Sequence, residues 1–348
     1  MESSPIKNGS LKRILVTRTD RLGDLVLSTP VFEALHHRFP EAHIVCLTFL
    51  ENRAVVEGNP YLQEVILYDK KGTEKGWWGN FLFSRKLAKK NFDAVIHLHP
   101  TNRMHLLTWL AGIPLRIGYR KKNGWALTHA IEDRKAEGKK HESEYNFDLL
   151  KFLNVSAPKE ISPYFPLKEK DKLSLGFLLR NLGFQPEKPY VVLNPSASCP
   201  SKIWPAERFA RLSDELQTRF NFQVALIGSN ADRRFAAKVK EYTTHPLTDF
   251  SGKLSLGTLG WFLKGAKLLI SNDSGPVHVA RAVQTPVLSI FGRNLSGLSP
   301  RRWGPLGKEA KIIHKEVSCP VCLAHNCQIN FLCLDVISVE DVLKEVKK

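Results

Sequence analysis

The chain has 348 residues, of which 43% are hydrophobic and 24% are charged, so it is long enough for two domains and too apolar for global disorder. Its 51 Lys and Arg outweigh its 34 Asp and Glu, and residues 1–174 and 175–348 share the excess almost equally. An even excess argues against a basic nucleic-acid-binding arm and is typical of an enzyme whose ligands are anions.

Short β-branched runs alternate with longer amphipathic stretches in the first half of the chain. Strands are predicted at 13–18, 43–49, 64–68 and 93–99, with helices over 25–38 and in the stretch that ends at residue 90. This alternation is typical of βαβ units, in which a mostly parallel sheet is covered by helices on both faces.

The same alternation begins again in the second half. Strands are predicted at 189–194, 222–228, 267–272 and 285–292, and helices at 205–220, 231–241 and 276–283. Residues 156–172 are rich in proline and charge, which favours a linker between a domain over 1–165 and another over 175–348. Two doubly wound α/β domains that face a cleft are expected, with their ligands held just beyond the carboxyl ends of the strands.

The turn after the first predicted strand carries Arg18, Arg21, Gly23 and Asp24. A dinucleotide-binding turn needs three spaced glycines, so the one glycine here argues against a nicotinamide cofactor. Asp24 could cap the helix that follows. It could also act as a carboxylate base, its ionised form favoured by the helix N-terminus and by the neighbouring arginines. The two roles are compatible, and both stay open.

Two post-strand segments of the second half could hold a phosphate group. Lys202 precedes a predicted helix, and Ser274 and Gly275 form a turn at the start of another, with His278 in its first turn. A lysine, a hydroxyl and helix amides suit a diphosphate. Asp273 would repel a diphosphate, so we expect it to accept hydrogen bonds from sugar hydroxyls or to orient His278 and the turn. The alternatives are a solvated lysine and an ordinary capped turn.

Several motifs in order along the chain resemble those of glycosyltransferase family 9, the heptosyltransferases that build the inner core of lipopolysaccharide. They are Gly23-Asp24 followed by STPVFEAL, SKIWPAERFA, IGSNADRRFA, NDSGPVHVARAVQTPVLSIFG and the cysteine-bearing tail. The resemblance covers nearly the whole chain. It implies a GT-B fold, an α/β fold of two Rossmann-like domains around a cleft, with the acceptor held by residues 1–165 and the nucleotide sugar by 175–348.

The resemblance implies an inverting transferase that moves a heptose from ADP-heptose to the lipid A-core acceptor. It implies Asp24 as the catalytic base. The donor contacts expected are Lys202, Asp273, Ser274, Gly275 and His278, with a third post-strand turn of Gly228, Ser229 and Asp232 on the same side. No metal and no cofactor is expected, because helix amides and Lys202 can stabilise the departing diphosphate.

The acceptor site is expected to use arginines, which bind phosphates and carboxylates bidentately. The candidates are Arg18, Arg21, Arg53, Arg103 and Arg120, with His97, His99, Asn102, Arg116 and Tyr119 nearby in the sequence. Any of these could instead be surface charge, and a structural role is the commoner one for a histidine at a strand end.

Residues 75–90 mix Trp77, Trp78, Phe81 and Phe83 with Lys and Arg. The favoured interpretation is that the aromatic side chains pack on the sheet, and the alternative is an interfacial helix that contacts a membrane. The chain has no apolar run long enough to span a bilayer, and its first residues lack the apolar core of a secretory signal. We therefore expect a cytoplasmic enzyme, with peripheral contact to the inner membrane as an open possibility.

Four of the six cysteines lie in one short segment, at Cys319, Cys322, Cys327 and Cys333. Zinc binding, buried free thiols and a facultative disulfide remain open for them. Another donor or acceptor within the same family is an alternative function. A nucleotide-sugar epimerase or dehydrogenase is disfavoured because three spaced glycines and a suitably placed Tyr-x-x-x-Lys pair are missing. A nucleic-acid-binding protein is disfavoured by the even charge.

Overall fold

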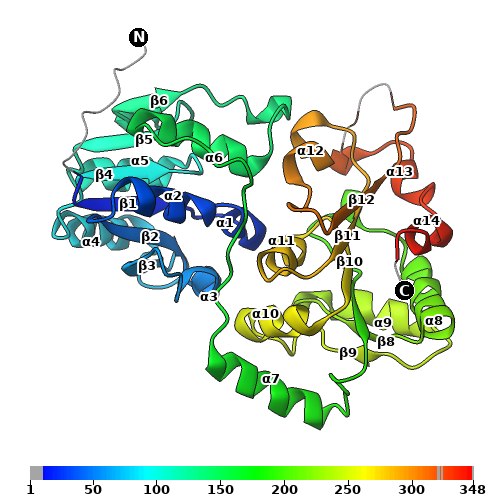
Figure 1. The fold of residues 1–348 in the computed structure, drawn as a ribbon. Helices are drawn as coiled ribbons and strands as arrows, with labels where there is room; N and C mark the ends of the chain where they lie inside the picture. The colour runs from blue at the N-terminus through cyan, green and yellow to red at the C-terminus, as the bar shows by residue number, and fades with distance from the viewer. Residues whose placement is uncertain (1–10, 320–321, 323, 347–348) are drawn as a thin grey trace. The chain divides into compact units, whose positions relative to one another are not determined.

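The computed structural model describes residues 11–319, 322 and 324–346, which fold as two α/β units (Figure 1). The first unit runs to Ala136 and resumes over Lys140–Pro166, and the second comprises Glu137–Lys139 and the chain from Leu167 onward. The helix α7 (Glu169–Asn181) belongs to the second unit, although its first residues fall in the segment predicted as a linker.

The first unit contains a parallel six-stranded sheet. Its strands are β1 (Arg13–Thr17), β2 (His43–Phe49), β3 (Glu64–Tyr68), β4 (Ala94–His97), β5 (Leu115–Tyr119) and β6 (His129–Ile131). They lie in the order β3-β2-β1-β4-β5-β6, which is the Rossmann order. The order reverses between β1 and β4, where Thr17 lies beside His97. Ligands of such sheets bind beyond the carboxyl ends of the strands at this switch point.

Helices connect these strands. They are α1 (Leu22–Val26), α2 (Pro30–Arg38), α3 (Arg53–Val56), α4 (Gly76–Ala88), α5 (Asn102–Leu110) and α6 (Glu142–Leu150). The prediction of one helix over 25–38 is wrong, because the chain forms α1 and α2 instead. The hydroxyls of Ser28 and Thr29 donate to the carbonyls of Asp24 and Val26 where α1 ends, and Pro30 suits the first position of α2 because it has no N–H to satisfy.

The helices α4 and α5 pack beside each other on one face of this sheet. Phe83 and Leu87 of α4 share a buried apolar cluster with Met104 and Leu107 of α5 and with residues of β1, β2 and β4. The prediction that Trp77, Trp78 and Phe81 pack on the sheet is wrong, because all three are exposed. Only Phe83, among the four aromatic residues of this segment, is buried.

The second unit repeats the same connectivity. Its parallel strands are β7 (Tyr190–Asn194), β8 (Gln223–Leu226), β9 (Thr248–Asp249), β10 (Leu268–Asn272), β11 (Val287–Phe291) and β12 (Ala310–His314), in the order β12-β11-β10-β7-β8-β9. Counted from β7, this is again the Rossmann order, with its switch point between β7 and β10.

The main helices of the second unit are α8 (Ala206–Phe220), α9 (Arg233–Tyr242), α10 (Leu256–Gly265), α11 (Gly275–Ala282), α12 (Pro300–Trp303), α13 (Leu332–Asp335) and α14 (Val339–Leu343). Trp204 is fully buried in the core of this unit, and its indole N–H donates to the carbonyl oxygen of Ile337 at 2.9 Å. This bond attaches the C-terminal segment to the hydrophobic core of the unit. Among the helices that the structure describes, none is both long and apolar enough to cross a bilayer.

Candidate active site

The predicted site residues lie beyond the carboxyl ends of parallel strands in both units. In the first unit, Arg18, Arg21 and Asp24 follow β1, and Asn102 and Arg103 follow β4. In the second, Lys202 follows β7 and Asp273 follows β10. Each group therefore lies at the switch point of its own sheet, where an α/β fold binds its ligand.

Arg18 is the centre of the polar network in the first unit. Its side chain is 1% exposed, and it directly follows β1. Its guanidinium donates to Asp20 Oδ1 at 2.9 Å, to Asp24 Oδ1 at 2.8 Å and to Glu142 Oε1 at 3.1 Å. Burial alone would lower the pKa of Arg18, but the charges of these three carboxylates raise it, so the arginine stays charged.

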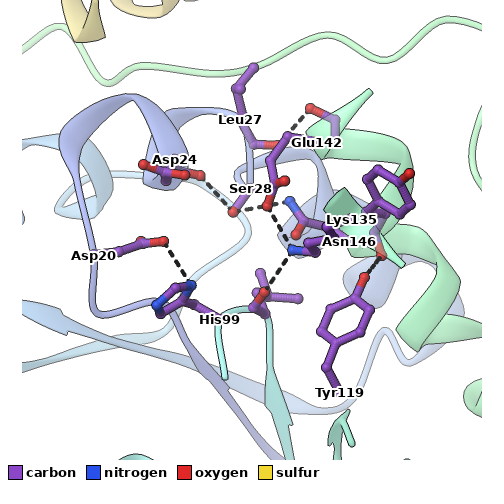
Figure 2. A network of polar contacts seen from close by, with 12 residues as sticks. Asp20, Asp24, Leu27, Ser28, His99, Tyr119, Lys135, Glu142 and Asn146 are labelled. Atoms are coloured by element: carbon purple, nitrogen blue, oxygen red, sulfur yellow. Dashed lines mark hydrogen bonds and ion pairs between the residues drawn. The ribbon is translucent and has the colours of Figure 1, made fainter. Parts of the chain in front are cut away.

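Buried side chains of α6 and of the segment before it, Lys135, Glu142 and Asn146, extend this hydrogen-bond network (Figure 2). Glu142, at the start of α6, also accepts a hydrogen bond from Lys135 Nζ at 2.7 Å. Asn146, one turn further along α6, accepts from Arg18 at 3.1 Å and donates to the hydroxyl of Ser28 at 3.2 Å. The network thus ties the end of β1 to α6, a segment distant in the sequence.

Asp24 occupies the third position of α1, and the N-cap of that helix is Arg21. The alternative role of Asp24 as a helix cap is therefore wrong. Burial is the main reason that the pKa of Asp24 is raised to about 6, the charge of Asp20 adds to the shift, and Arg18 opposes it. A carboxylate that titrates near 6 is mostly ionised at neutral pH and still basic enough to accept a proton from a hydroxyl.

Asp20 and His99 form a second polar pair at the same strand edge (Figure 2). His99 Nδ1 lies 3.4 Å from Asp20 Oδ2. Burial is the main cause that lowers the pKa of His99 to about 4, with the charges of Arg18 and Lys135 contributing, so the imidazole is neutral at pH 7. Burial raises the pKa of Asp20, and Arg18 partly offsets that effect.

His97 has a structural environment. It is fully buried, and its two ring nitrogens contact the hydroxyls of Thr17 at 2.8 Å and Thr108 at 3.1 Å. Burial holds the pKa of His97 well below its ordinary value. Its neutral ring therefore pairs with hydroxyls of β1 and α5, and it presents no charge to a ligand.

The predicted acceptor residues differ in their accessibility. Arg18 is buried among carboxylates, so its guanidinium is not presented to an acceptor, in contrast to the role expected for it. Tyr119 is also buried, and its hydroxyl donates to the carbonyl oxygen of Tyr145. The exposed candidates are Arg21, Arg53, Arg103 and Arg120, which follow β1, β2, β4 and β5 and therefore lie along one edge of the parallel sheet.

In the second unit, one carboxylate lies between two cations. Asp273 Oδ2 is 2.7 Å from Lys202 Nζ and 3.0 Å from Arg293 Nη2, and all three side chains are largely buried. Asp273 therefore orients Lys202 and Arg293, and its expected contact to His278 stays a prediction. Two cations and one carboxylate leave an excess positive charge, which suits an anionic ligand. Arg293 was not among the predicted residues, although it follows β11 at the same sheet edge.

The turn that follows β10 is held by side chains of the neighbouring strand. Asn194, the last residue of β7, donates to the hydroxyls of Ser271 at 3.1 Å and of Ser274 at 2.8 Å. Ser274 is the N-cap of α11, but its side chain makes no capping hydrogen bond to the helix. Gly275 opens α11, and His278 is buried in the first turn. The first turn of α11 thus lacks a side-chain cap, as expected for a helix end that binds an anion.

The third predicted turn follows β8. Ser229 and Asp232 form a capping box, in which the amide of Ser229 donates to Asp232 Oδ2 at 2.8 Å and its hydroxyl donates at 2.6 Å. A Cβ at Gly228 would lie 3.0 Å from Asp232 Cβ, so the close turn favours glycine. Ser229 and Asp232 therefore hydrogen-bond to each other. Their turn follows β8 and lies at the same edge of the sheet as Lys202 and Asp273.

The four C-terminal cysteines line a common cavity that also contacts Ser201 and Arg293. Cys319, Cys322, Cys327 and Cys333 all carry free thiols. Burial, followed by the proximity of Cys327 and Cys322, raises the pKa of Cys333. Within the described residues, no group of three or more His, Cys, Asp or Glu side chains is arranged to hold a metal ion.

Comparison with known proteins shows the family to which the chain is similar. The sequence model of glycosyltransferase family 9 (heptosyltransferase) matches residues 81–332. Lipopolysaccharide heptosyltransferase 3 of Escherichia coli (strain K12) is 29% identical over 290 residues, which cover 78% of this chain and 79% of that protein.

Two solved structures are similar over nearly the whole chain. The glycosyl transferase family 9 structure from Veillonella parvula DSM 2008 has a TM-score of 0.85 at 26% identity, with 98% of both chains covered. E. coli ADP-heptose lps heptosyltransferase II has a TM-score of 0.77 at 21% identity, with 96% of this chain and 97% of that chain covered. These similarities confirm the predicted GT-B fold class with its two Rossmann-like domains.

The Arg18 network predicts a stability change that depends on pH. Arg18→Leu leaves Asp20, Asp24 and Glu142 buried without their shared cation, so we expect the free energy of unfolding to fall by about 3–5 kcal/mol at pH 8. Without the cation the carboxylates bind protons more tightly in the folded protein, so the loss should shrink as the pH falls. Urea unfolding between pH 5 and 8, monitored by circular dichroism, measures both effects.

The matched control is Arg53→Leu, which removes an exposed arginine paired with Glu57. This variant should keep nearly the wild-type stability at every pH, because exposed ion pairs contribute little. Equal losses in the two variants, or a loss in Arg18→Leu that does not depend on pH, would contradict the assigned role of Arg18.

Proposed function

Because this chain belongs to glycosyltransferase family 9, we propose that it transfers a heptose from ADP-heptose to a lipid-linked acceptor of the lipopolysaccharide core. The observation that carries the proposal is the placement of Asp24, a partly buried carboxylate with a pKa raised to about 6, beyond the carboxyl end of β1. The names of its relatives support a role in lipopolysaccharide synthesis, since a lipopolysaccharide heptosyltransferase is among the proteins similar to this chain. We propose that the enzyme works at the cytoplasmic face of the inner membrane, where such an acceptor is embedded.

The charge of the second unit supports a nucleoside diphosphate donor. Lys202 and Arg293 are held by Asp273 near the uncapped first turn of α11, so cations and helix amides can contact the same diphosphate. The similar E. coli enzyme is described as an ADP-heptose heptosyltransferase, which supports ADP-heptose as the donor. We assign Ser274, Gly275 and His278 to the donor site, with Gly228 and Ser229 at its border.

The proposed reaction uses the carboxylate of Asp24 in the first unit and the diphosphate site of the second unit. The ionised carboxylate of Asp24 accepts the proton of an acceptor hydroxyl while the oxygen of that hydroxyl attacks the anomeric carbon of the heptose. The bond from the anomeric carbon to the diphosphate oxygen breaks, and ADP leaves with the electron pair. Lys202, Arg293 and the amides of α11 stabilise the negative charge that grows on the leaving group. Attack from the face opposite the leaving group inverts the anomeric centre.

The arginines of the first unit divide into two roles. We propose that Arg18 orients Asp24 and favours the ionised form of the neighbouring carboxylates, because its guanidinium donates hydrogen bonds to Asp24 and Glu142. Arg21, Arg53, Arg103 and Arg120 are exposed along the strand edge that carries Asp24, so we assign them to the phosphates and acidic sugars of the acceptor.

We expect Asp24→Asn to lower kcat by about 10²–10⁴-fold, because the amide cannot accept the proton of the acceptor hydroxyl. The donor should still bind with nearly wild-type affinity, since Asp24 and the donor residues belong to different units. Purified protein, ADP-heptose and extracted core acceptor provide the assay, and calorimetry with ADP-heptose measures binding. Wild-type turnover in this variant would remove Asp24 from the mechanism.

The pH dependence of kcat/KM tests the same carboxylate. Activity should fall as the pH drops below about 6, because Asp24 is then protonated. Asp20→Asn removes a negative neighbour that raises the pKa of Asp24, so its acid limb should move to lower pH. The raised pKa also means that ionisation of Asp24 costs stability as the pH rises through about 6. Asp24→Asn should therefore be no less stable than the wild type at pH 8, which separates loss of the base from unfolding.

The donor site is tested by removing its cations. Lys202→Ala and Arg293→Ala should each weaken ADP-heptose binding by about tenfold or more, because a charge-assisted contact to the diphosphate is lost. Lys238→Ala, an exposed lysine of α9 in the same unit, is the matched control and should bind normally. Competition with ADP, UDP and GDP in this assay identifies the base preference. Normal donor binding by both variants would contradict the assignment.

A further inference from the structure

The first unit presents a surface of exposed aromatic and aliphatic side chains, which we name the tryptophan face. Its most prominent members are Trp77 at 75% exposure, Trp78 at 59%, Trp125 at 64% and Trp109 at 44%. The remaining members are Phe81 and Leu82 of α4 and Leu106 and Leu110 of α5. Four of the seven tryptophans of the chain are therefore exposed on α4, on α5 or on the short 3-10 helix beside α5. Such a concentration of exposed apolar side chains marks an interaction site.

Ring contacts group these side chains into two aromatic clusters, one on α4 and one that joins α5 to the 3-10 helix beside it. The rings of Trp77 and Trp78 stack at 4.4 Å, and Trp78 lies 5.7 Å from Phe81 on the same helix. Trp109 of α5 meets Trp125, in the short 3-10 helix Gly124–Ala126, at 5.3 Å between ring centroids.

The same helices are joined through their buried sides. α4 and α5 pack beside each other and bury Phe83 and Met104 in one cluster against the sheet. Their opposite sides, which carry Trp78 and Trp109, therefore point away from the sheet in the same layer. The tryptophan face is the outer surface of this helical layer.

The charge around this face is strongly positive. Residues 70–90 and 102–125 contain the basic residues Lys70, Lys71, Lys75, Arg85, Lys86, Lys89, Arg103, Arg120 and Lys122, besides Lys90 and Lys121, which pair with Glu64 and Asp133, and Arg116, which donates to backbone carbonyls. Glu74 is the one acidic residue in these two segments, and its side chain is buried, where it accepts a hydrogen bond from the amide of Asp69. On α4, Arg85 and Lys86 follow Phe81 and Leu82 by four residues, so the basic and apolar side chains share one side of the helix.

We propose that the tryptophan face docks the enzyme on an anionic lipid bilayer, with the indoles in the headgroup region and the surrounding Lys and Arg on lipid phosphates. Tryptophan is enriched at membrane interfaces because its ring is apolar and its N–H is polar, and basic residues bind anionic headgroups. A second copy of the chain fits this face poorly, because a symmetric contact would bring the same basic residues of both copies together.

The placement of α5 connects docking to the reaction. Arg103 lies in the first turn of α5, just beyond β4, whereas Leu106 and Leu110 lie three and seven positions further along the same side of that helix. A lipid-linked acceptor would thus meet an arginine at the strand edge while its membrane lies against the rest of the helix. The inference rests on the proposed function for its purpose, but docking itself requires no sugar substrate.

Vesicle binding of the full chain tests this inference without any substrate. Vesicles of phosphatidylcholine with about one-third phosphatidylglycerol should bind the wild-type protein, and binding should weaken with added salt. Trp77→Ala/Trp78→Ala and Trp109→Ala/Trp125→Ala should each lower the partition coefficient by about tenfold or more, because two interfacial indoles are lost. Co-sedimentation gives the partition coefficient, and brominated lipid chains should quench the tryptophan emission of the wild type.

The matched control is Leu173→Ala/Phe177→Ala, which removes two exposed apolar side chains of α7 in the other unit. This variant should bind vesicles like the wild type. Circular dichroism of all variants verifies that each one is folded. Transfer to a water-soluble, delipidated acceptor should stay near wild-type in the tryptophan variants and fall only with membrane-embedded acceptor, so failure of docking and failure of the proposed chemistry are distinguishable.

Three results would overturn the inference. One is equal vesicle binding by the wild type and both tryptophan variants. Another is binding that does not depend on phosphatidylglycerol. The third is a lipid-free dimer in sedimentation velocity that Trp77→Ala/Trp78→Ala converts to monomer, which would assign the face to a second copy of the chain.

Discussion

The structure of the first unit depends on a buried arginine that is shared by three carboxylates. Arg18 follows β1 and contacts Asp20 and Asp24 nearby and Glu142 on α6. An isolated charge in this position would be too costly to bury, so the arginine requires its acidic partners and they require it. Lys135 supplies a second cation to Glu142, which still leaves one more carboxylate than cations. The excess negative charge and the burial together raise the pKa of Asp24 into the range of a general base.

The second unit also contains a buried cluster of charged side chains, but there the excess charge is positive. There the carboxylate of Asp273 lies between Lys202 and Arg293, so the cluster has one more cation than carboxylates. The same Rossmann connectivity thus carries a cluster with excess negative charge at one switch point and a cluster with excess positive charge at the other, which we propose act as the proton acceptor and the diphosphate site. This division matches the needs of glycosyl transfer, in which one partner loses a proton and the other releases a diphosphate.

The regular parts of the fold were predictable, because buried parallel strands such as β2 and β7 contain uninterrupted apolar runs, at residues 44–47 and 190–193. The short strands β6 and β9 carry only half-buried residues and have no such signal. Asp24 and Lys202 could be proposed from the sequence because each follows a predicted strand, and their roles stay predictions. The burial of Arg18 was not predictable, since its partner Glu142 is 124 residues away. Arg293 was not predicted, because its contact to Asp273 forms only in the folded chain, although its position just after β11 was a usable signal.

The exposure of Trp77 and Trp78 shows that the hydrophobic pattern of a helix does not tell which of its aromatic residues are buried. An aromatic residue on an amphipathic helix usually faces the core, but Phe83 and Leu87 already fill the contact between α4 and the sheet.

We infer that the Arg18 network, through burial and excess negative charge, raises the pKa of Asp24 and makes it a base, and a direct titration tests this inference. Carbon NMR of protein labelled at the aspartate carboxyl carbons, with Asp24→Asn to assign the signal, measures the pKa of Asp24 without any turnover. We expect a pKa of about 6 for Asp24. A carboxyl that titrates near the ordinary aspartate value of about 3.9 would contradict it.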